Sequence, residues 1–353
     1  MKLLACTDKG LIEFENVSGK FQFGRIHFPG QPVAYLDCYD EVWRVAINHK
    51  HWGSKIHKSE DNGQSWQELN APKFPSSILA QNNQATLRSI WNITAHNKEE
   101  FYVGVEPAAI FHSRDGGNSY DFMEGLWNHP TRKSWIGGGK GSTKPFLHHI
   151  IVDPANHNHL FAAVSCAGVL ESYDNGKSWK MINEGIRADF LPNPEAVAGH
   201  DPHNLKMSQK NPLVIWQQNH CGIFRTENGG KHWNDLTPNI ETSGYGFALA
   251  IDAKDDNRAW VIPCESDSMR IAPGNKLSVY STSDAGTTWR RLSNGLPQDG
   301  VFDIVLRHGL DIRNSHLAFG TNNGNLYHSP DFGENWNIIT QNLSAVRCVK
   351  LLA

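Results

Sequence analysis

The sequence predicts an all-β fold, a single seven-bladed β-propeller made of four-stranded antiparallel blades. Three observations predict it: an eight-residue box that recurs along the chain, a strand–turn–strand pattern before each box, and terminal strands that lack a box. The Asp or Asn at the third position of the box recurs after 54, 59, 54, 56 and 47 residues. A fixed period of this length in strand-rich sequence is typical of propeller blades. The six copies of the box are residues 59–66, 113–120, 172–179, 226–233, 282–289 and 329–336.

Each blade is predicted to contain four strands, as the last box-bearing blade illustrates. Residues 316–328 alternate apolar and polar side chains around a Gly-marked turn, which predicts two strands. Residues 300–306 are expected to supply the strand before them, and residues 336–339 the strand after the box. Four strands per repeat match a propeller blade.

The box itself is predicted to form the turn between the third and fourth strands. The carboxylate of Asp174 is expected to accept backbone N–H groups two residues on, as in an Asx-turn. Gly176 permits the positive φ that such a tight turn needs, and Trp179 is expected to pack between neighbouring blades. The box is therefore expected to be architectural.

The seventh blade is predicted from the two ends of the chain. Residues 3–15 repeat the strand–turn–strand pattern without a box, and residues 19–23 supply a fourth strand. Residues 345–351 read as the missing first strand, so both termini close one blade and leave no open sheet edge. One domain is therefore expected over residues 1–353. Its blades are expected at residues 1–28 with 344–353, and at about 30–70, 75–124, 145–183, 200–237, 245–293 and 300–341.

The composition indicates which kinds of partner and which cellular environment to expect. With 39% hydrophobic residues the chain can bury a core, and a net charge of −3 predicts no binding to nucleic acid or an anionic membrane. No apolar run reaches 18 residues, so no membrane span is expected, and Asp8 interrupts the first residues before a signal peptide is complete. The six cysteines show no CxxC spacing. Reduced thiols and a cytoplasmic protein are therefore expected.

The boxes and their flanks resemble those of bacterial sialidase-like Asp-box (BNR) repeat proteins, propellers often labelled glycosyl hydrolases. The resemblance covers nearly the whole chain and implies the fold, because the same box occurs in sialidases, xyloglucanases, sorting receptors and photosystem assembly factors. Sialidases normally have six blades and an Arg-Ile-Pro signature, which here stands only as Arg25-Ile26-His27. Xyloglucanase-like enzymes use paired Asp across a groove between two propellers, which one propeller cannot form. Classical sialidase activity is therefore not expected.

One end of the predicted blades carries the unusual loops. Propeller topology places the box turns at one face and gathers the second-to-third strand turns and the connections between blades at the other face. Long insertions on one face of a repeat fold usually mark its binding side. The turns in question are residues 48–53, 104–107, 165–168, 219–222 and 264–275, and the connections are residues 127–149 and 185–203.

Polar residues that can carry chemistry converge on this face. Imidazoles beside carboxylates suit acid–base catalysis near neutral pH, and they also suit a divalent metal. The catalytic candidates are Glu106, His149, His203, His220 and Glu265. The candidates for substrate contacts are Arg187, Asn219 and His129. A metal, if one is bound, would be held by His149, His203 and His220.

These residues also have structural interpretations. A single loop histidine more often satisfies backbone groups than it catalyses, whereas a polar cluster in a concave pocket favours a functional site. The glycine run at residues 137–143 resembles a phosphate-binding loop but lacks the flanking strand and helix. Cys221 beside His220 suggests a thiol nucleophile, although neighbours on a turn need not face each other.

The pattern favours a hydrolase- or lyase-type enzyme that acts on a small polar or sugar-derived molecule at the mouth of the central channel. A glycosidase would need two carboxyl groups roughly 5–9.5 Å apart. Arg187 would meet anionic groups of the substrate. The alternative is a non-catalytic binding or assembly module that holds a protein or peptide, with an apolar rim of Trp52, Trp127 and Trp135.

Overall fold

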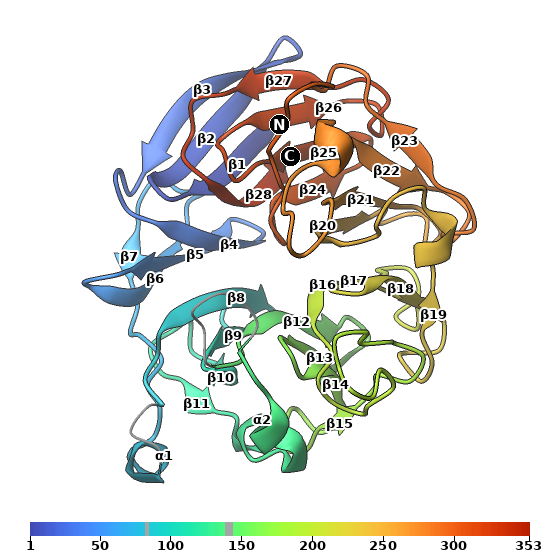
Figure 1. Ribbon diagram of the computed structural model, residues 1–353. Helices are drawn as coiled ribbons and strands as arrows, with labels where there is room; N and C mark the ends of the chain where they lie inside the picture. The colour runs from blue at the N-terminus through green and yellow to red at the C-terminus, as the bar shows by residue number, and fades with distance from the viewer. Residues whose placement is uncertain (82–84, 138–143) are drawn as a thin grey trace. The chain divides into compact units, whose positions relative to one another are not determined.

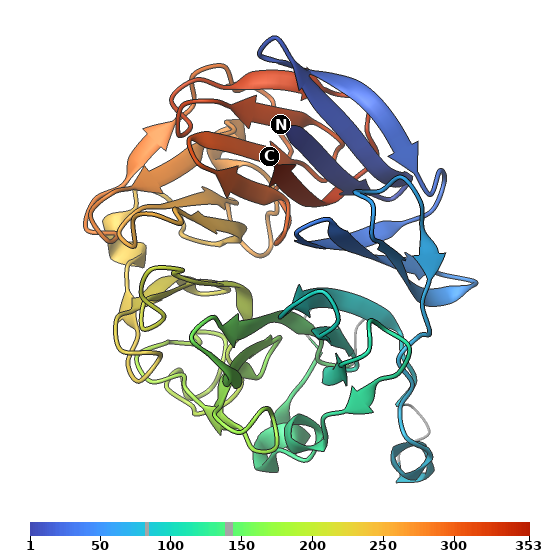
Figure 2. The same ribbon diagram turned by 180° about the vertical axis from the view of Figure 1, so that it is seen from behind.

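The computed structural model describes residues 1–81, 85–137 and 144–353. Its strands form seven four-stranded antiparallel sheets with very few helices between them, so the chain is a seven-bladed β-propeller as predicted (Figures 1 and 2). The chain divides into two compact units. Unit 1 comprises residues 1–31, 184–195 and 203–353, and unit 2 comprises residues 32–183 and 196–202. Each unit is described by itself below.

Unit 2 contains three blades. The first has strands β4 (Val33–Tyr39), β5 (Val42–His49), β6 (Gly53–Ser59) and β7 (Gln67–Glu68). The second has β8 (Ser89–Ala95), β9 (Phe101–Glu106), β10 (Ala109–Ser113) and β11 (Asp121–Phe122). The third has β12 (Leu147–Asp153), β13 (Asn156–Val164), β14 (Gly168–Ser172) and β15 (Lys180–Met181). The connections carry the short helices α1 (Ser76–Gln81), α2 (Glu124–Trp127) and η1 (Pro130–Ser134).

Unit 1 contains four blades. Three of them have their strands in chain order. The first has β16 (Pro202–Met207), β17 (Ile215–Asn219), β18 (Gly222–Thr226) and β19 (Asn234–Asp235), and the second has β20 (Gly246–Ile251), β21 (Ala259–Pro263), β22 (Val279–Thr282) and β23 (Arg290–Leu292). The third has β24 (Leu310–Arg313), β25 (His316–Gly320), β26 (Leu326–Ser329) and β27 (Asn337–Thr340). The fourth has the order β28 (Val346–Leu352), β1 (Lys2–Thr7), β2 (Gly10–Val17) and β3 (Lys20–His27). Two single turns, η2 (Thr237–Asn239) and η3 (Pro273–Asn275), lie in its loops.

The blade formed by both termini confirms the predicted closure. β28 pairs antiparallel with β1, with Leu3 opposite Leu351 and Ala5 opposite Val349. These side chains are buried in one apolar cluster, and both chain ends lie in this blade (Figure 1). The pairing covers the edge of β1 that would otherwise expose unpaired backbone groups.

The predicted strand over residues 300–306 is wrong. The blade takes its first strand from β24, and residues 301–306 form no strand. Val301, Ile304 and Val305 are buried, which accounts for the apolar residues of this segment. The backbone nevertheless bonds to the turn after β25, because Ile304 N–H donates to the Asn322 side chain at 2.8 Å and Asn322 N–H donates to the Ile304 carbonyl at 2.9 Å. A partly buried loop therefore carries the apolar residues that were expected to form a strand.

Large aromatic side chains fill the space between neighbouring blades of each unit. In unit 1, Trp260, Phe319 and Trp336 join one cluster that spans the blades β20–β23 and β24–β27. In unit 2, Trp179 belongs to a cluster shared by the blades β8–β11 and β12–β15. Burial of such rings supplies much of the apolar contact in a repeat fold. The predicted packing of the box tryptophan is confirmed at these positions.

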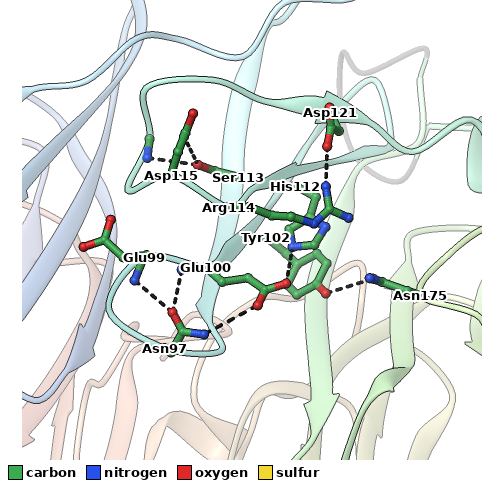
Figure 3. A network of polar contacts seen from close by, with 11 residues as sticks. Asn97, Glu99, Glu100, Tyr102, His112, Ser113, Arg114, Asp115, Asp121 and Asn175 are labelled. Carbon is green, nitrogen blue, oxygen red and sulfur yellow. Dashed lines mark hydrogen bonds and ion pairs between the residues drawn. The ribbon is translucent and has the colours of Figure 1, made fainter.

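The box turn is held by a buried hydroxyl as well as by its carboxylate. In the third copy, Ser172 Oγ accepts the Gly176 N–H at 2.8 Å, and Asp174 accepts the Ser178 N–H at 2.9 Å. The expected bond to a backbone N–H two residues after the Asp is wrong, because that N–H belongs to Gly176 and the serine takes it. Gly176 has φ of +76° as expected. The equivalent serine and carboxylate of the second copy are Ser113 and Asp115 (Figure 3).

The structure also describes the pairing of the cysteines and the length and apolarity of the helices. All six cysteines lie within the described residues, and none of them forms a disulfide bond. Within the described residues, the structure contains no helix with the length and apolarity that a bilayer crossing requires.

Candidate functional site

The residues singled out from the sequence fall into both units. Unit 2 contains Glu106, His129 and His149, and unit 1 contains Arg187, His203, Asn219, His220 and Glu265. His149 and His203 were expected at the ends of loops, but they lie within β12 and β16 and are 5% and 2% exposed. Both strands therefore begin earlier than the sequence suggested, which fixes these rings in place.

Unit 1 brings His203 and His220 together. Their ring centroids are 5.5 Å apart, and the rings meet edge to face. His203 Nδ1 lies 2.6 Å from the Gly246 carbonyl, so the neutral ring carries its proton on Nδ1 and presents Nε2 as an acceptor. The His203 ring also stacks on Phe247 at 4.6 Å. Backbone and packing together set the orientation of this imidazole.

His220 lies beside a carboxylate that the sequence reasoning missed. Its Nε2 is 3.7 Å from Asp267 Oδ2, and the other oxygen of Asp267 accepts the Tyr245 hydroxyl at 3.1 Å. The Tyr245 ring lies 5.3 Å from the His220 ring. Three separate segments, the β17–β18 turn, the start of β20 and the β21–β22 loop, thus contribute an imidazole, a phenol and a carboxylate. We call His203, His220, Tyr245 and Asp267 the imidazole–carboxylate cluster.

The environment fixes the protonation of two members of this cluster. Burial raises the pKa of Tyr245 far above its usual range, so the hydroxyl stays protonated and acts as a hydrogen-bond donor. Burial also tends to raise the pKa of Asp267, but the hydrogen bond from Arg270 and the charge of His220 outweigh it and lower the pKa. Asp267 is therefore a carboxylate near neutral pH.

Cations and an aromatic ring lie beside the cluster. Arg270 donates to Asp267, and its guanidinium lies 5.5 Å from the Phe247 ring centroid. The Arg307 guanidinium lies 4.9 Å from the same centroid. Phe247 and Tyr245 form a small buried apolar group with Cys264 and Ile304. The cluster thus lies beside both buried apolar side chains and positively charged guanidinium groups.

The loop after β15 is tied to the β17–β18 turn. Arg187 donates to the Cys221 carbonyl at 3.0 Å, and it pairs with Asp189 and Asp235. The Phe190 ring, 44% exposed, meets the His220 ring edge to face at 5.0 Å. Burial raises the pKa of Cys221, which argues against a thiolate nucleophile there. Arg187 thus shapes the loop, and its predicted contact with a substrate stays a prediction.

Two other candidates in unit 1 bond within their own loops. Asn219 is fully buried, donates to the Gln217 side chain at 2.6 Å and accepts the Cys221 N–H at 3.0 Å. Glu265 accepts the Gly274 N–H at 2.8 Å, which braces the loop that carries Asp267. The sequence offered a signal for Asp267, because Asp267 and Arg270 form an i,i+3 pair in this long loop.

In unit 2, the candidates Glu106 and His129 contact residues of their own blade and its connection. Glu106 ends β9, where it accepts from Trp91 Nε1 at 3.4 Å and lies 4.0 Å from Arg88 Nη1. His129 caps η1 through Thr131 and stacks on Trp135 at 5.7 Å. Burial lowers the pKa of His129, so its ring is neutral near pH 7. The connection that holds His129 also includes residues 138–143 of the glycine run, which lie outside the described residues.

A second polar network of unit 2 lies on β9 and β10 (Figure 3). His112 Nε2 is 2.8 Å from Glu100, and the Tyr102 ring stacks on the His112 ring at 4.1 Å. The Tyr102 hydroxyl donates to Asn175 at 2.9 Å, which links this blade to the box turn of the next. These groups satisfy one another, so we interpret the network as structural.

The apolar rim of three tryptophans expected for a binding module does not form. Trp52 is 76% exposed, but Trp135 is 6% exposed and the Trp127 ring contacts Phe74 and Phe122. Trp127 also stacks with Arg132. Trp135 is therefore buried and Trp127 is half-buried, so they do not form an exposed apolar rim with Trp52.

Metal binding by the predicted histidines stays a prediction. Within unit 1, the neighbouring rings of His203 and His220 offer nitrogen donors of the kind that divalent metals accept. The contact between His203 Nδ1 and a carbonyl is the arrangement that often orients a metal-bound imidazole.

No family model matches the chain. Among curated proteins, the chain is similar to the oligoxyloglucan-reducing end-specific xyloglucanase of Emericella nidulans, with 22% identity over 265 residues. It is also similar to the probable oligoxyloglucan-reducing end-specific xyloglucanase of Neosartorya fischeri, with 24% identity over 269 residues. Each alignment covers 67% of this chain and 30% of the relative. The chain therefore spans about 30% of the length of the curated relatives that it matches.

Solved structures share the fold. YCF48 from Cyanidioschyzon merolae has a TM-score of 0.59 and 16% identity, covering 92% of this chain and 89% of that chain. An ancestral GH74 enzyme has a TM-score of 0.55 and 17% identity, covering 87% of this chain and 38% of that chain. YCF48 bound to a D1 peptide has a TM-score of 0.54 and 15% identity, covering 87% and 80%. The chain is thus a propeller similar to those of xyloglucanases and YCF48, and membership of the sialidase-like repeat proteins stays a prediction.

Proposed function

We propose that the chain is a hydrolase- or lyase-type enzyme that acts on a small polar, sugar-derived molecule at the imidazole–carboxylate cluster. One observation carries the proposal: the contact between His220 and Asp267, with Tyr245 on the same carboxylate. A carboxylate beside an imidazole stabilises the imidazolium that forms when the ring accepts a proton, which makes the ring an effective acid–base group.

The roles of the cluster follow from its protonation. His220 takes a proton from the substrate and returns it, while Asp267 orients the ring and stabilises its charged form. Tyr245 holds Asp267 through a donor hydroxyl and keeps the carboxylate in position. Asp267 replaces Glu265 as the carboxylate of the reaction, because Glu265 accepts a backbone bond that shapes the loop.

The surroundings favour a ring-shaped polar substrate. Phe190 offers a half-exposed aromatic face next to His220, and apolar faces of sugar rings stack on such side chains. Arg270 and Arg307 supply positive charge near Phe247. The similarity to xyloglucanases over 67% of the chain supports a carbohydrate class of substrate.

The second candidate function is non-catalytic binding of a peptide by the same loops. The observation that favours it is the fold shared with YCF48 bound to a D1 peptide, of which the chain covers 80%. In this case, the imidazole–carboxylate cluster would hold polar groups of the peptide without turning it over.

A turnover screen separates the two functions. Purified protein is incubated with xyloglucan oligosaccharides, aryl glycosides and uronic acid disaccharides, and products are detected by mass. We expect His220→Gln to lose at least about 100-fold in turnover, because it removes the proton carrier. The matched control is His232→Gln, because His232 is 53% exposed and lies 3.8 Å from Glu184.

Two results would reject an enzyme that acts through His220. One is the absence of product from the wild-type protein with every compound while a peptide library yields binders that His220→Gln loses. The other is equal turnover by the wild type and His220→Gln. Equal melting temperatures of the two proteins would show that the comparison reports chemistry and not unfolding.

A further inference from the structure

Unit 2 contains a pocket between the end of its first blade and the second copy of the box. The pocket has a volume of about 360 Å³, which lies within the range of pockets that hold small molecules. The segment after β7 and the last residues of the box line it together. The lining residues are Asn70, Ala71, Lys73, Asn118, Ser119 and Tyr120.

The pocket lies at the copy of the box that does not end in tryptophan. Tyr120 stands at this position, and its ring meets the Phe101 ring edge to face at 6.0 Å. A phenol ring occupies less volume than an indole, so this copy leaves more space between neighbouring blades than the others do. The tryptophans that end the other copies are Trp66, Trp179, Trp233, Trp289 and Trp336.

Hydrogen bonds within the protein hold the side chains of the pocket in place. Asn70 Nδ2 donates to the Asn118 carbonyl at 2.7 Å, which joins the two segments that line the pocket. Asn118 Nδ2 donates to the Asp115 carbonyl at 2.6 Å. Ser119 Oγ donates to Asp115 Oδ2 at 2.5 Å. A ligand therefore meets groups that are already ordered, which lowers the entropic cost of binding.

The same hydrogen bonds determine what the pocket offers to a ligand. Both asparagines use their amide nitrogen, and among the described residues neither Asn70 Oδ1 nor Asn118 Oδ1 accepts a hydrogen bond. Ser119 Oγ gives its proton to Asp115, so its lone pairs can accept. The Lys73 side chain is exposed, and no carboxylate in the described ranges pairs with its ammonium. The pocket thus presents three acceptor oxygens and one cation.

We propose that this pocket binds a polyhydroxylated carboxylate, such as a sugar acid. Hydroxyl groups of the ligand donate to the oxygens of Asn70, Asn118 and Ser119, and its carboxylate accepts a charge-assisted hydrogen bond from Lys73. A neutral sugar lacks the group that meets the lysine, and a simple carboxylate lacks the donors that the three oxygens need. The site goes beyond the proposed enzyme function, because it binds without turnover and shares no residue with the imidazole–carboxylate cluster.

Calorimetric titration of the full chain with glucuronate, glucose and acetate tests the pocket, at constant ionic strength set with chloride. Glucuronate should bind roughly tenfold more tightly than the other two probes, because it alone meets both the oxygens and the cation. Lys73→Gln should weaken glucuronate binding roughly tenfold, to the level of glucose. Tyr120→Trp places the usual residue of the box here, and its larger ring should weaken binding by more than about tenfold. The matched control is Lys177→Gln, because Lys177 is an exposed lysine on the third box turn of the same unit.

Each outcome decides for or against the pocket. Glucuronate binding that persists in His220→Gln and Lys177→Gln but weakens in Lys73→Gln supports it. Binding that His220→Gln loses and Lys73→Gln keeps would assign glucuronate to the imidazole–carboxylate cluster and overturn the pocket. Absence of glucuronate binding overturns it too, as does equal affinity for all three probes or equal weakening by Lys177→Gln. If Tyr120→Trp does not fold, Lys73→Gln decides alone. The titration measures binding without turnover, so it stays readable if the proposed enzyme activity fails.

Discussion

His328 shows how strongly the fold alters a single titratable group. Its ring is 4% exposed, and its Nε2 lies 2.9 Å from His316 Nδ1, with the two rings stacked at 5.2 Å. Only one proton can lie between the two nitrogens, so a second positive charge would face the first. Burial, followed by the charge of His316, lowers the pKa of His328 to about 4. The His328 ring is therefore neutral in the folded protein.

This residue predicts an acid-dependent loss of stability. The unfolded histidine titrates at about 6.5, so between that pH and the folded value the unfolded state binds more protons. The stabilisation is complete above about pH 6.5 and is lost as the pH falls toward 4, by up to about 3 kcal/mol. Urea unfolding of the wild type and His328→Gln at several pH values measures it. A variant with the same pH dependence as the wild type would contradict the assignment, and His232→Gln is the control.

At the scale of elements, the box turn is held by a buried and an exposed serine hydroxyl, which form different hydrogen bonds. Ser172, 2% exposed, accepts the Gly176 N–H and donates to Asp174 at 2.8 Å. Ser178 is exposed and donates to the other oxygen of Asp174 at 2.6 Å. Loss of the first hydroxyl leaves a buried N–H without a partner, whereas water can replace the second.

We therefore expect Ser172→Ala to lower the free energy of unfolding by about 1–2 kcal/mol and Ser178→Ala by less than about half of that. Thermal and urea unfolding of the two variants provide the comparison. The interpretation fails if both substitutions cost the same, because the cost would then come from the carboxylate they share.

The sequence could predict those turns and strands whose conformation depends on neighbouring residues alone. Turn residues at fixed positions located the box, and Gly176 was required by its positive φ. The prediction of a strand over residues 300–306 was wrong, because Val301, Ile304 and Val305 are buried in a loop that forms no strand. Backbone partners in the turn after β25 decided that segment, and no local pattern reveals them.

At the scale of the whole molecule, closure by the termini gives another prediction. β28 buries Val346, Val349 and Leu351 against β1 and the blade β24–β27. Deletion of residues 344–353 removes this apolar burial and exposes the edge of β1. The melting temperature should fall by more than about 10 °C, with aggregation on heating. Deletion of the exposed Ala353 alone is the control, and an unchanged melting temperature after the longer deletion would contradict the closure.

The candidate site was only partly predictable. The sequence singled out His203 and His220, because the segments around them interrupt a regular repeat. It missed Asp267 and Tyr245, since the partner of His220 depends on how the β21–β22 loop folds back. Glu265 was the more conspicuous acid in that loop, but its bond to Gly274 is visible only in three dimensions.

The central claim is that function resides in the imidazole–carboxylate cluster and not in the box turns. Hydrogen exchange of the wild-type chain, measured by mass with and without each compound of the oligosaccharide screen, tests it most directly. The account predicts slower exchange in residues 184–190, 219–222 and 264–275 with a bound compound, since these segments surround His220 and Asp267. Slower exchange confined to box turns such as residues 172–179 and 226–233 would contradict it.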